Sequence, residues 1–265
     1  MLEYEFMRNA LFAILIMTPL FGLVGTVIVN NKMAFFSDAL GHSALTGIAI
    51  GALLGITNPT ISMIVFGVVF ALLLNKIKDL KITSRDTIIS VFSSTALAAG
   101  LVILSKNGNF SKFSNYLIGD ILSIVPSEII TLFIIAILVL IFWILFSNKM
   151  YAISLNASLA KSKGIKSSLV ENLFIVLVAA IVMVSIRWVG ILIINSMLIL
   201  PAAASRNIAN NLRQYHFYSI AFAMFSGIVG LVASYYLGIA TGPTIVLISS
   251  MIFFITYFIR RKIGD

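Results

Sequence analysis

Residues 129–146 read IITLFIIAILVLIFWILF, a continuous apolar run that contains no charged side chain. At a rise of 1.5 Å per residue, a helix of about 20 residues spans the hydrocarbon core of a bilayer. No water is present there to satisfy backbone N–H and C=O groups, so a single chain segment crosses the core as an α-helix. The run therefore predicts a transmembrane helix.

Similar runs recur on both sides of this one. Of the 265 residues, 60% are hydrophobic and only 10% are charged, and the mean hydropathy is +1.11. A soluble domain carries about 25% charged residues, so we expect an all-α polytopic membrane protein of about eight to nine transmembrane helices. The other predicted membrane segments are Leu11–Val29, Ala34–Ile56, Pro59–Leu74, Ile88–Leu104, Leu169–Ile186, Gly190–Leu200, Tyr215–Leu237 and Pro243–Ile259.

The run Gly190–Leu200 is too short to span a bilayer by itself. Either it borrows flanking residues, or it is a half-helix buried among neighbouring helices. Pro201 follows the run, and we expect a separate cytoplasmic helix over Ala202–Leu212.

The chain carries 18 Lys and Arg residues against 9 Asp and Glu residues, which gives a net charge of +9. Most of the basic residues gather in four clusters, and two predicted spans separate each cluster from the next. By the positive-inside rule all four clusters face the cytoplasm. This orientation places Met1–Asn9 outside and accounts for the charge without a nucleic-acid partner. The clusters are Lys76–Arg85, Lys149–Lys166, Arg206–Arg213 and Arg260–Lys262.

Several kinds of chemistry are excluded by the residues that the sequence lacks. The chain has no cysteine, which excludes disulfides, thiolate metal ligands and a cysteine nucleophile. It also lacks the GxxxxGK[ST] loop that cradles nucleotide phosphates, the HExxH zinc motif and the GxSxG nucleophile elbow. We therefore predict no catalytic residues and no enzyme activity in this chain.

One apolar run contains an ionisable pair, in the stretch Ser37-Asp38-Ala39-Leu40-Gly41-His42-Ser43. Asp38 and His42 are four residues apart, so on a helix they share one face. Ionisable groups inside a membrane are costly and indicate a function. The pair can ligate a divalent transition-metal ion, hold helices together, or relay protons, and the residues alone leave these three readings open. A metal site would need further ligands, from a second copy of the chain or from other side chains.

Other polar residues near the apolar runs have structural interpretations. We expect His216 to lie in an aromatic belt at the membrane interface, and Arg187 and Trp188 to anchor the opposite interface. Asp120 and Glu128 are predicted to be turn and helix-cap residues.

The cytoplasmic connection over about residues 155–166 is a second candidate site. It has helix-compatible apolar positions at Leu155, Leu159 and Ala160, and Gly164 is suited to end the helix. A short basic helix between two spans can contact a soluble partner, and an ordinary interfacial loop helix fits the same residues.

Four blocks of sequence give the chain a family resemblance. They occur in the same order as in the family and are distributed over nearly the whole chain. With them the chain resembles the integral membrane permeases of the ATP-binding-cassette importers for zinc, manganese and iron(II). The blocks are MAFFSDALGHSALTG (33–47), YLIGDIL (116–122), Val189–Ala203, and Ser234–Leu237 with Thr241–Pro243.

The resemblance implies the larger-type ABC importer permease fold, an all-helical homodimer with a translocation path at the dimer interface. Residues 1–265 would form a single transmembrane permease domain. The implied partners are a pair of cytoplasmic ATP-binding subunits, an extracellular metal-binding protein and a second copy of the chain, all at a lipid bilayer.

Residue by residue, Asp38 and His42 match the metal-path positions of this family. The segment around residues 155–166 resembles its coupling helix, which docks on the ATPase. The implied ATPase-coupling residues are Ala157, Ala160, Gly164 and Ile165.

Two residues depart from the family pattern. Thr46 stands where many members have proline, which predicts a straighter helix. Gly238 stands where an acidic residue is common, which removes an outer-gate carboxylate.

With the resemblance, the sequence predicts the membrane-spanning permease subunit of an ATP-driven importer of manganese, zinc or iron, in a bacterial cytoplasmic membrane. The ion is the transported substrate, and we expect no permanently bound cofactor. A carboxylate and an imidazole without thiolate suit these ions and disfavour copper(I). A proton-coupled or facilitative metal carrier that works without an ATPase is the alternative.

Overall fold

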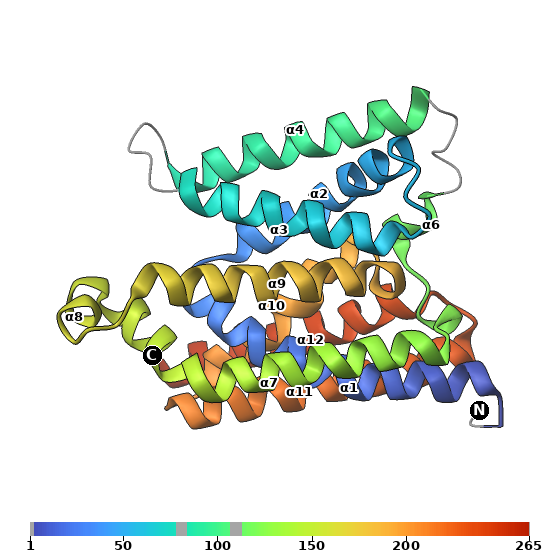
Figure 1. Cartoon of the computed structure of the whole chain (residues 1–265). Helices are drawn as coiled ribbons and strands as arrows, with labels where there is room; N and C mark the ends of the chain where they lie inside the picture. Colours follow the sequence, from blue (N-terminus) through green and yellow to red (C-terminus); the bar gives the residue numbers. More distant parts are fainter. Residues whose placement is uncertain (1–2, 78–83, 107–112, 265) are drawn as a thin grey trace. The chain divides into compact units, whose positions relative to one another are not determined.

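The computed structural model describes residues 3–77, 84–106 and 113–264. These ranges contain eleven α-helices and one 3₁₀ helix, η1, joined mostly by short connections (Figure 1), which confirms the predicted all-α class. The helices are α1 (Glu5–Asn30), α2 (Ala34–Leu53), α3 (Pro59–Ile77), α4 (Arg85–Lys106), α6 (Asn115–Ile118), η1 (Ile121–Ser123), α7 (Pro126–Leu155), α8 (Ala157–Ser162), α9 (Ser167–Val189), α10 (Ile191–Ile208), α11 (Leu212–Leu237) and α12 (Thr241–Gly264).

The chain divides into two compact units, each assembled from segments far apart in sequence. The first unit comprises Met1–Lys32, Ile118–Ile137 and Trp188–Asp265, and it contains α1, α10, α11 and α12. The second comprises Met33–Leu117 and Leu138–Arg187, and it contains α2, α3, α4, α8 and nearly all of α9. Helix α7 contributes to both units.

Seven of the described helices are long and apolar enough to cross a membrane, judged by length and composition: α1, α3, α4, α7, α9, α11 and α12 up to Arg260. This finding agrees with a multi-pass α-helical membrane protein. Helices α2 and α10 coincide with predicted membrane segments and are 20 and 18 residues long, but they are not among the seven.

Pro201 does not end the helix in which it lies. Helix α10 runs unbroken from Ile191 to Ile208, so the short run Gly190–Leu200 borrows its flanking residues. The prediction of a separate helix over Ala202–Leu212 is wrong, because an interior proline removes one backbone donor without ending the helix here. The chain breaks after Ile208 instead. There the side chain of Asn211 accepts a hydrogen bond from the backbone N–H of Gln214 and caps α11.

The apolar run at residues 129–146 also belongs to a longer helix than predicted. Helix α7 has 30 residues, which corresponds to about 45 Å and exceeds the bilayer core of about 30 Å. Lys149, which we expected in a connection, therefore lies inside α7. Its Nζ is 5.0 Å from the centroid of the Phe146 ring, a cation–π contact that favours continued helix.

In the first unit, small residues let helices approach closely. A β-carbon on Gly22 of α1 would lie 2.8 Å from the carbonyl oxygen of Ser219 in α11. The Ser219 hydroxyl donates a hydrogen bond of 2.7 Å to the carbonyl of Gly22. A β-carbon on Gly25 would lie closer still to the backbone carbonyl of Leu198 in α10. Contacts of this kind hold membrane helices together because lipid supplies no hydrophobic driving force between them.

In the second unit, α2 packs against both α3 and α4. The Thr46 hydroxyl of α2 donates a hydrogen bond to the carbonyl of Ala96 in α4. Gly100 of α4 leaves no space for a side chain, since a β-carbon there would lie 2.7 Å from the backbone nitrogen of Thr46. Helix α2 is unbroken around Thr46. Thr46, expected from the resemblance to stand at a position where proline is common, thus supplies a hydroxyl that ties α2 to α4.

Two glycines of the first unit allow a backbone crossing. Gly119 (φ 73°) lies between α6 and η1, and Gly190 (φ 92°) lies between α9 and α10. A β-carbon on either residue would overlap the backbone of the other. A β-carbon on Gly242, at the start of α12, would be 3.4 Å from the carbonyl oxygen of Val189. Three of the four sequence blocks therefore meet here: residues 116–122, Val189–Ala203 and Thr241–Pro243.

We predict that Gly119→Ala destabilises the protein by about 2–5 kcal/mol, because left-handed strain of about 1–2 kcal/mol adds to overpacking of about 1–3 kcal/mol. The matched control is Gly55→Ala. Gly55 also has a positive φ, of 70°, but no atom lies within 4 Å of its β-carbon position, so only the strain applies. Thermal unfolding of the purified chain in detergent measures the difference. Equal decreases in the unfolding temperature of the two variants would contradict the tight crossing of Gly119 and Gly190.

Candidate functional site

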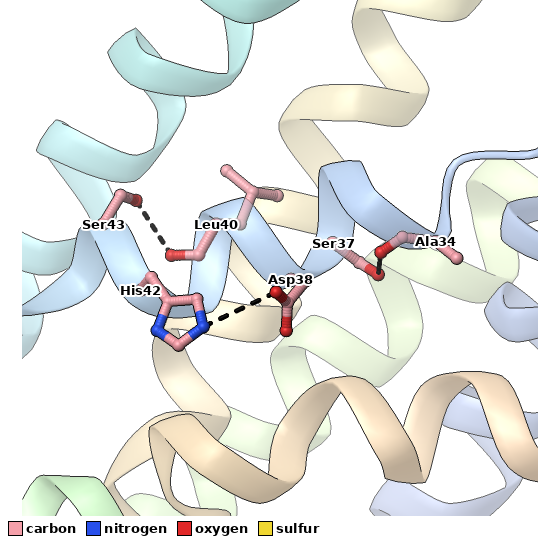
Figure 2. A network of polar contacts seen from close by, with 6 residues as sticks. All are labelled: Ala34, Ser37, Asp38, Leu40, His42 and Ser43. Carbon is pink, nitrogen blue, oxygen red and sulfur yellow. Dashed lines mark hydrogen bonds and ion pairs between the residues drawn. The ribbon is translucent and has the colours of Figure 1, made fainter. Parts of the chain in front are cut away.

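Asp38 and His42 lie on the same face of α2, one turn apart. Figure 2 shows both side chains projecting from one side of the helix, with His42 Nε2 3.5 Å from Asp38 Oδ2. The side chain of Asp38 is 45% exposed and that of His42 is 28% exposed. The i, i+4 spacing predicted this juxtaposition, and the structure brings the two groups together.

The other residues in this part of α2 are buried. Between Phe36 and Ala49, every residue except Asp38 and His42 is buried. The neighbouring hydroxyls of Ser37 and Ser43 turn back to their own helix, where they donate to the carbonyls of Ala34 (2.9 Å) and Leu40 (2.8 Å) (Figure 2). The carboxylate and the imidazole are therefore the two groups through which this stretch of α2 presents polar atoms to an incoming ligand.

The geometry of the pair suits a shared cation. Two ligands at about 2.1 Å from a tetrahedral metal ion lie about 3.4 Å from each other, close to the observed 3.5 Å. The same distance also fits a direct ion pair between a carboxylate and a protonated imidazole. Within the described residues, no group of three or more His, Cys, Asp and Glu side chains gathers to hold a metal. One copy of the chain thus offers two donors at this place.

The two predicted cap residues act as caps. Asp120 accepts a hydrogen bond from the backbone N–H of Leu122 (3.0 Å) and begins η1. Glu128 accepts one from the backbone N–H of Val125 (3.1 Å) in front of α7. Its Oε2 atom also accepts a hydrogen bond of 3.1 Å from the indole N–H of Trp188. Trp188, predicted as an interface anchor, is only 4% exposed, so its indole is buried and partnered within the protein.

His216 has a partner as well. Its Nδ1 lies 3.1 Å from the hydroxyl of Thr26 in α1, and the ring is partly buried. The neighbouring Tyr215 hydroxyl donates to the carbonyl of Thr26 (3.3 Å). The prediction of an interfacial belt residue missed this contact between α1 and α11, because two residues so far apart in sequence give no local signal.

Gly238 has a local structural role. It ends α11 in the left-handed conformation (φ 65°), which glycine adopts without strain. An acidic residue here would have to adopt an unfavourable backbone conformation.

The connection between α7 and α9 forms α8 (Figure 1). The side chain of Asn156 accepts a hydrogen bond from the backbone N–H of Leu159 (3.0 Å) and caps its start. At its end, the N–H of Gly164 donates to the carbonyl of Lys161 (2.9 Å), and the N–H of Ile165 donates to the carbonyl of Ala160 (3.1 Å). This pair of bonds is a Schellman motif, with Gly164 at the left-handed position (φ 77°).

The Schellman motif explains the spacing of alanine and glycine in this segment. Ala160 is 2% exposed and packs inward, while Gly164 reverses the chain. Leu155, at the end of α7, and Leu159, in α8, are exposed instead, so these two leucines supply the exposed apolar surface of this connection. The two motif residues set the shape of the connection rather than its contact surface.

Sequence reasoning passed over an amide pair in the second unit. The side-chain NH₂ of Asn75 in α3 donates to Oδ1 of Asn172 in α9 at 2.6 Å. Such pairs join membrane helices. The sequence did contain a signal for this pair: Asn75 and Asn172 are each a polar amide near the basic end of an apolar run.

Comparison with known proteins identifies the family. The ABC 3 transport family matches residues 3–260. The chain is 31% identical over 261 residues to the "High-affinity zinc uptake system membrane protein ZnuB" of Haemophilus influenzae, covering 98% of this chain and 100% of that protein. It is 30% identical to the "Manganese import system permease protein ScaB" of Streptococcus gordonii, covering 98% and 92%.

A solved structure supports the same assignment. The chain is similar to a chain of "PsaBC from Streptococcus pneumoniae in complex with Fab", with a TM-score of 0.87, 29% identity and coverage of 99% of this chain and 96% of that one. The all-helical fold, the polar pair on α2 and the match over nearly the whole sequence lead to one conclusion: the chain belongs to the ABC 3 transport family.

Proposed function

We propose that this chain is the membrane-spanning permease subunit of an ATP-driven importer of divalent transition-metal ions. The observation that carries the proposal is the family match over residues 3–260, together with relatives named for zinc uptake and manganese import. These relatives are named as membrane and permease proteins of transport systems. The chain accordingly acts in transport and not as an enzyme.

The transported ion is manganese, zinc or iron(II), held briefly by Asp38 and His42. The named relatives support zinc and manganese. A carboxylate oxygen and an imidazole nitrogen suit all three ions. Their separation of 3.5 Å and their exposure on an otherwise closed helix face support a shared ligand.

A second copy of the chain completes the transport path in this proposal. Residues 1–265 form one permease domain, in which α2 and α10 join the seven long apolar helices to give nine spans. The basic helix ends then face the cytoplasm and the amino terminus lies outside. The protein works in a bacterial cytoplasmic membrane.

The energy comes from a partner. A pair of cytoplasmic ATP-binding subunits docks on α8 and the turn that follows it, and an extracellular metal-binding protein delivers the ion. Ala157, at the start of α8, together with Ala160, Gly164 and Ile165, belongs to this coupling segment. The Schellman motif fixes the direction in which α8 leaves the membrane helices, so movement of the ATPase is transmitted to α7 and α9.

We predict that Asp38→Ala and His42→Ala each lower metal uptake by about tenfold or more, since even the loss of an outer-shell partner of a metal site costs about 10–100-fold. Uptake of manganese, zinc and iron is measured in cells that lack this chain and regain each variant. Ser43→Ala is the matched control, because the Ser43 hydroxyl donates to the carbonyl of Leu40 in its own helix, and uptake by this variant should stay normal. Normal uptake in the Asp38 and His42 variants would remove the proposed site.

The same uptake assay separates the importer from its rival. Import that continues when the ATP-binding partner is absent would favour a proton-coupled or facilitative carrier, in which Asp38 and His42 relay protons.

A second prediction concerns the turn after α8. Gly164→Ala adds strain of about 1–2 kcal/mol at a left-handed position, although no atom lies within 4 Å of its β-carbon. We expect ATP hydrolysis by the assembled transporter to become uncoupled from uptake. Gly164→Asn should retain coupling, because asparagine tolerates this conformation. Loss of coupling in both variants to the same extent would show that the backbone conformation is not what matters.

A further inference from the structure

An open cavity of about 570 Å³ lies at the junction of α8 and α9, in the second unit. Its lining comes from the end of α8, the connection after it and the first turns of α9. The cavity is separate from Asp38 and His42, neither of which lines it.

One end of this cavity is a set of hydrogen-bond donors without a carboxylate. Lys161 and Lys166 contribute two exposed ammonium groups, and Ser168 contributes an exposed hydroxyl. Asn172 also lines the cavity. Its Oδ1 already accepts from Asn75, so the group it can offer to a ligand is its NH₂. No Asp or Glu is among the lining residues, and this end therefore suits an anion.

Farther along α9, apolar side chains line the cavity beside Asn172. Leu169 and Leu173 are 50% and 42% exposed, and their i, i+4 spacing places them on one face of the helix. Val176 continues this wall. Helix α9 is one of the seven helices long and apolar enough to cross a membrane. The cavity thus joins a cationic end to an apolar strip on a membrane helix.

We propose that this cavity binds an anionic phospholipid, with the phosphate at Lys161 and Lys166 and the first acyl methylenes along Leu169 and Leu173. Charge complementarity and the adjoining apolar strip select this occupant. A zwitterionic lipid carries a quaternary ammonium next to its phosphate and leaves the positive charge of the two lysines uncompensated, and a free anion would leave the leucines unused. Basic pockets beside membrane helices on the cytoplasmic side are where anionic headgroups bind. The site is separate from Asp38 and His42 but shares Ile165 with the coupling segment of the proposed function, and its cytoplasmic placement rests on the orientation proposed there.

The experiment compares two lipids that differ only in headgroup. The full chain is purified in detergent and titrated with phosphatidylglycerol or phosphatidylcholine of the same acyl chains, and native mass spectrometry counts bound lipid. We expect phosphatidylglycerol to bind more tightly, with about a fivefold loss of affinity for each of Lys161→Gln and Lys166→Gln. Leu173→Gln should weaken the binding of both lipids, because it removes the apolar contact with the acyl chain.

Lys163→Gln is the matched control, because Lys163 lies in the same basic turn but does not line the cavity. Its effect should be clearly smaller than that of Lys166→Gln. Equal effects of the two substitutions would overturn the site and indicate a diffuse surface charge. Displacement of the bound phosphatidylglycerol by glycerol phosphate, at the same concentration as the whole lipid, would also overturn the site and indicate a simple anion site.

Discussion

The structure depends on how closely its helices and connections can approach one another. Inside a membrane, helices are not driven together by the exclusion of water, so contacts form where small residues bring backbones within van der Waals distance. The crossing of Gly119 and Gly190 imposes this constraint on both partners, because neither position has room for a β-carbon. It joins the connection before α7 to the start of α10. The hydrogen bond between Glu128 and Trp188 then secures the same region.

The close packing also defines the candidate site. Around Asp38 and His42, the other residues of α2 are taken up by contacts, as the Thr46 bond to Ala96 and the fit of Gly100 illustrate. A helix fixed in this way holds its two polar side chains in a set direction. Ionisable groups are expensive in such surroundings, and here they stand at the positions that remain open. The free-energy cost of placing ionisable groups in the membrane therefore falls at the two side chains that a bound cation could stabilise.

The sequence predicted features that depend on neighbours along the chain. The membrane helices follow from continuous apolar runs, the shared face of Asp38 and His42 follows from their spacing, and the turn at Gly164 follows from local backbone chemistry. Features that depend on distant residues were missed. Trp188 looked like an interface anchor because Glu128 is remote in sequence, and His216 looked like a belt residue because Thr26 is more remote still. Pro201 looked like a helix end because the sequence around it does not show that α10 packs against α1, α11 and α12.

The pair of donors on α2 fits transport better than storage. A divalent ion of this class prefers four or more ligands, and Asp38 with His42 supplies two. A pair fixed on a rigid helix cannot improve its own coordination by rearranging. In the proposed dimer, the remaining ligands therefore have to come from outside the helix, from the second copy or from water. Movements that bring these ligands together or apart would change the affinity for the ion without distorting α2. Such a site can accept an ion in one state and release it in the other, as conduction through a membrane requires.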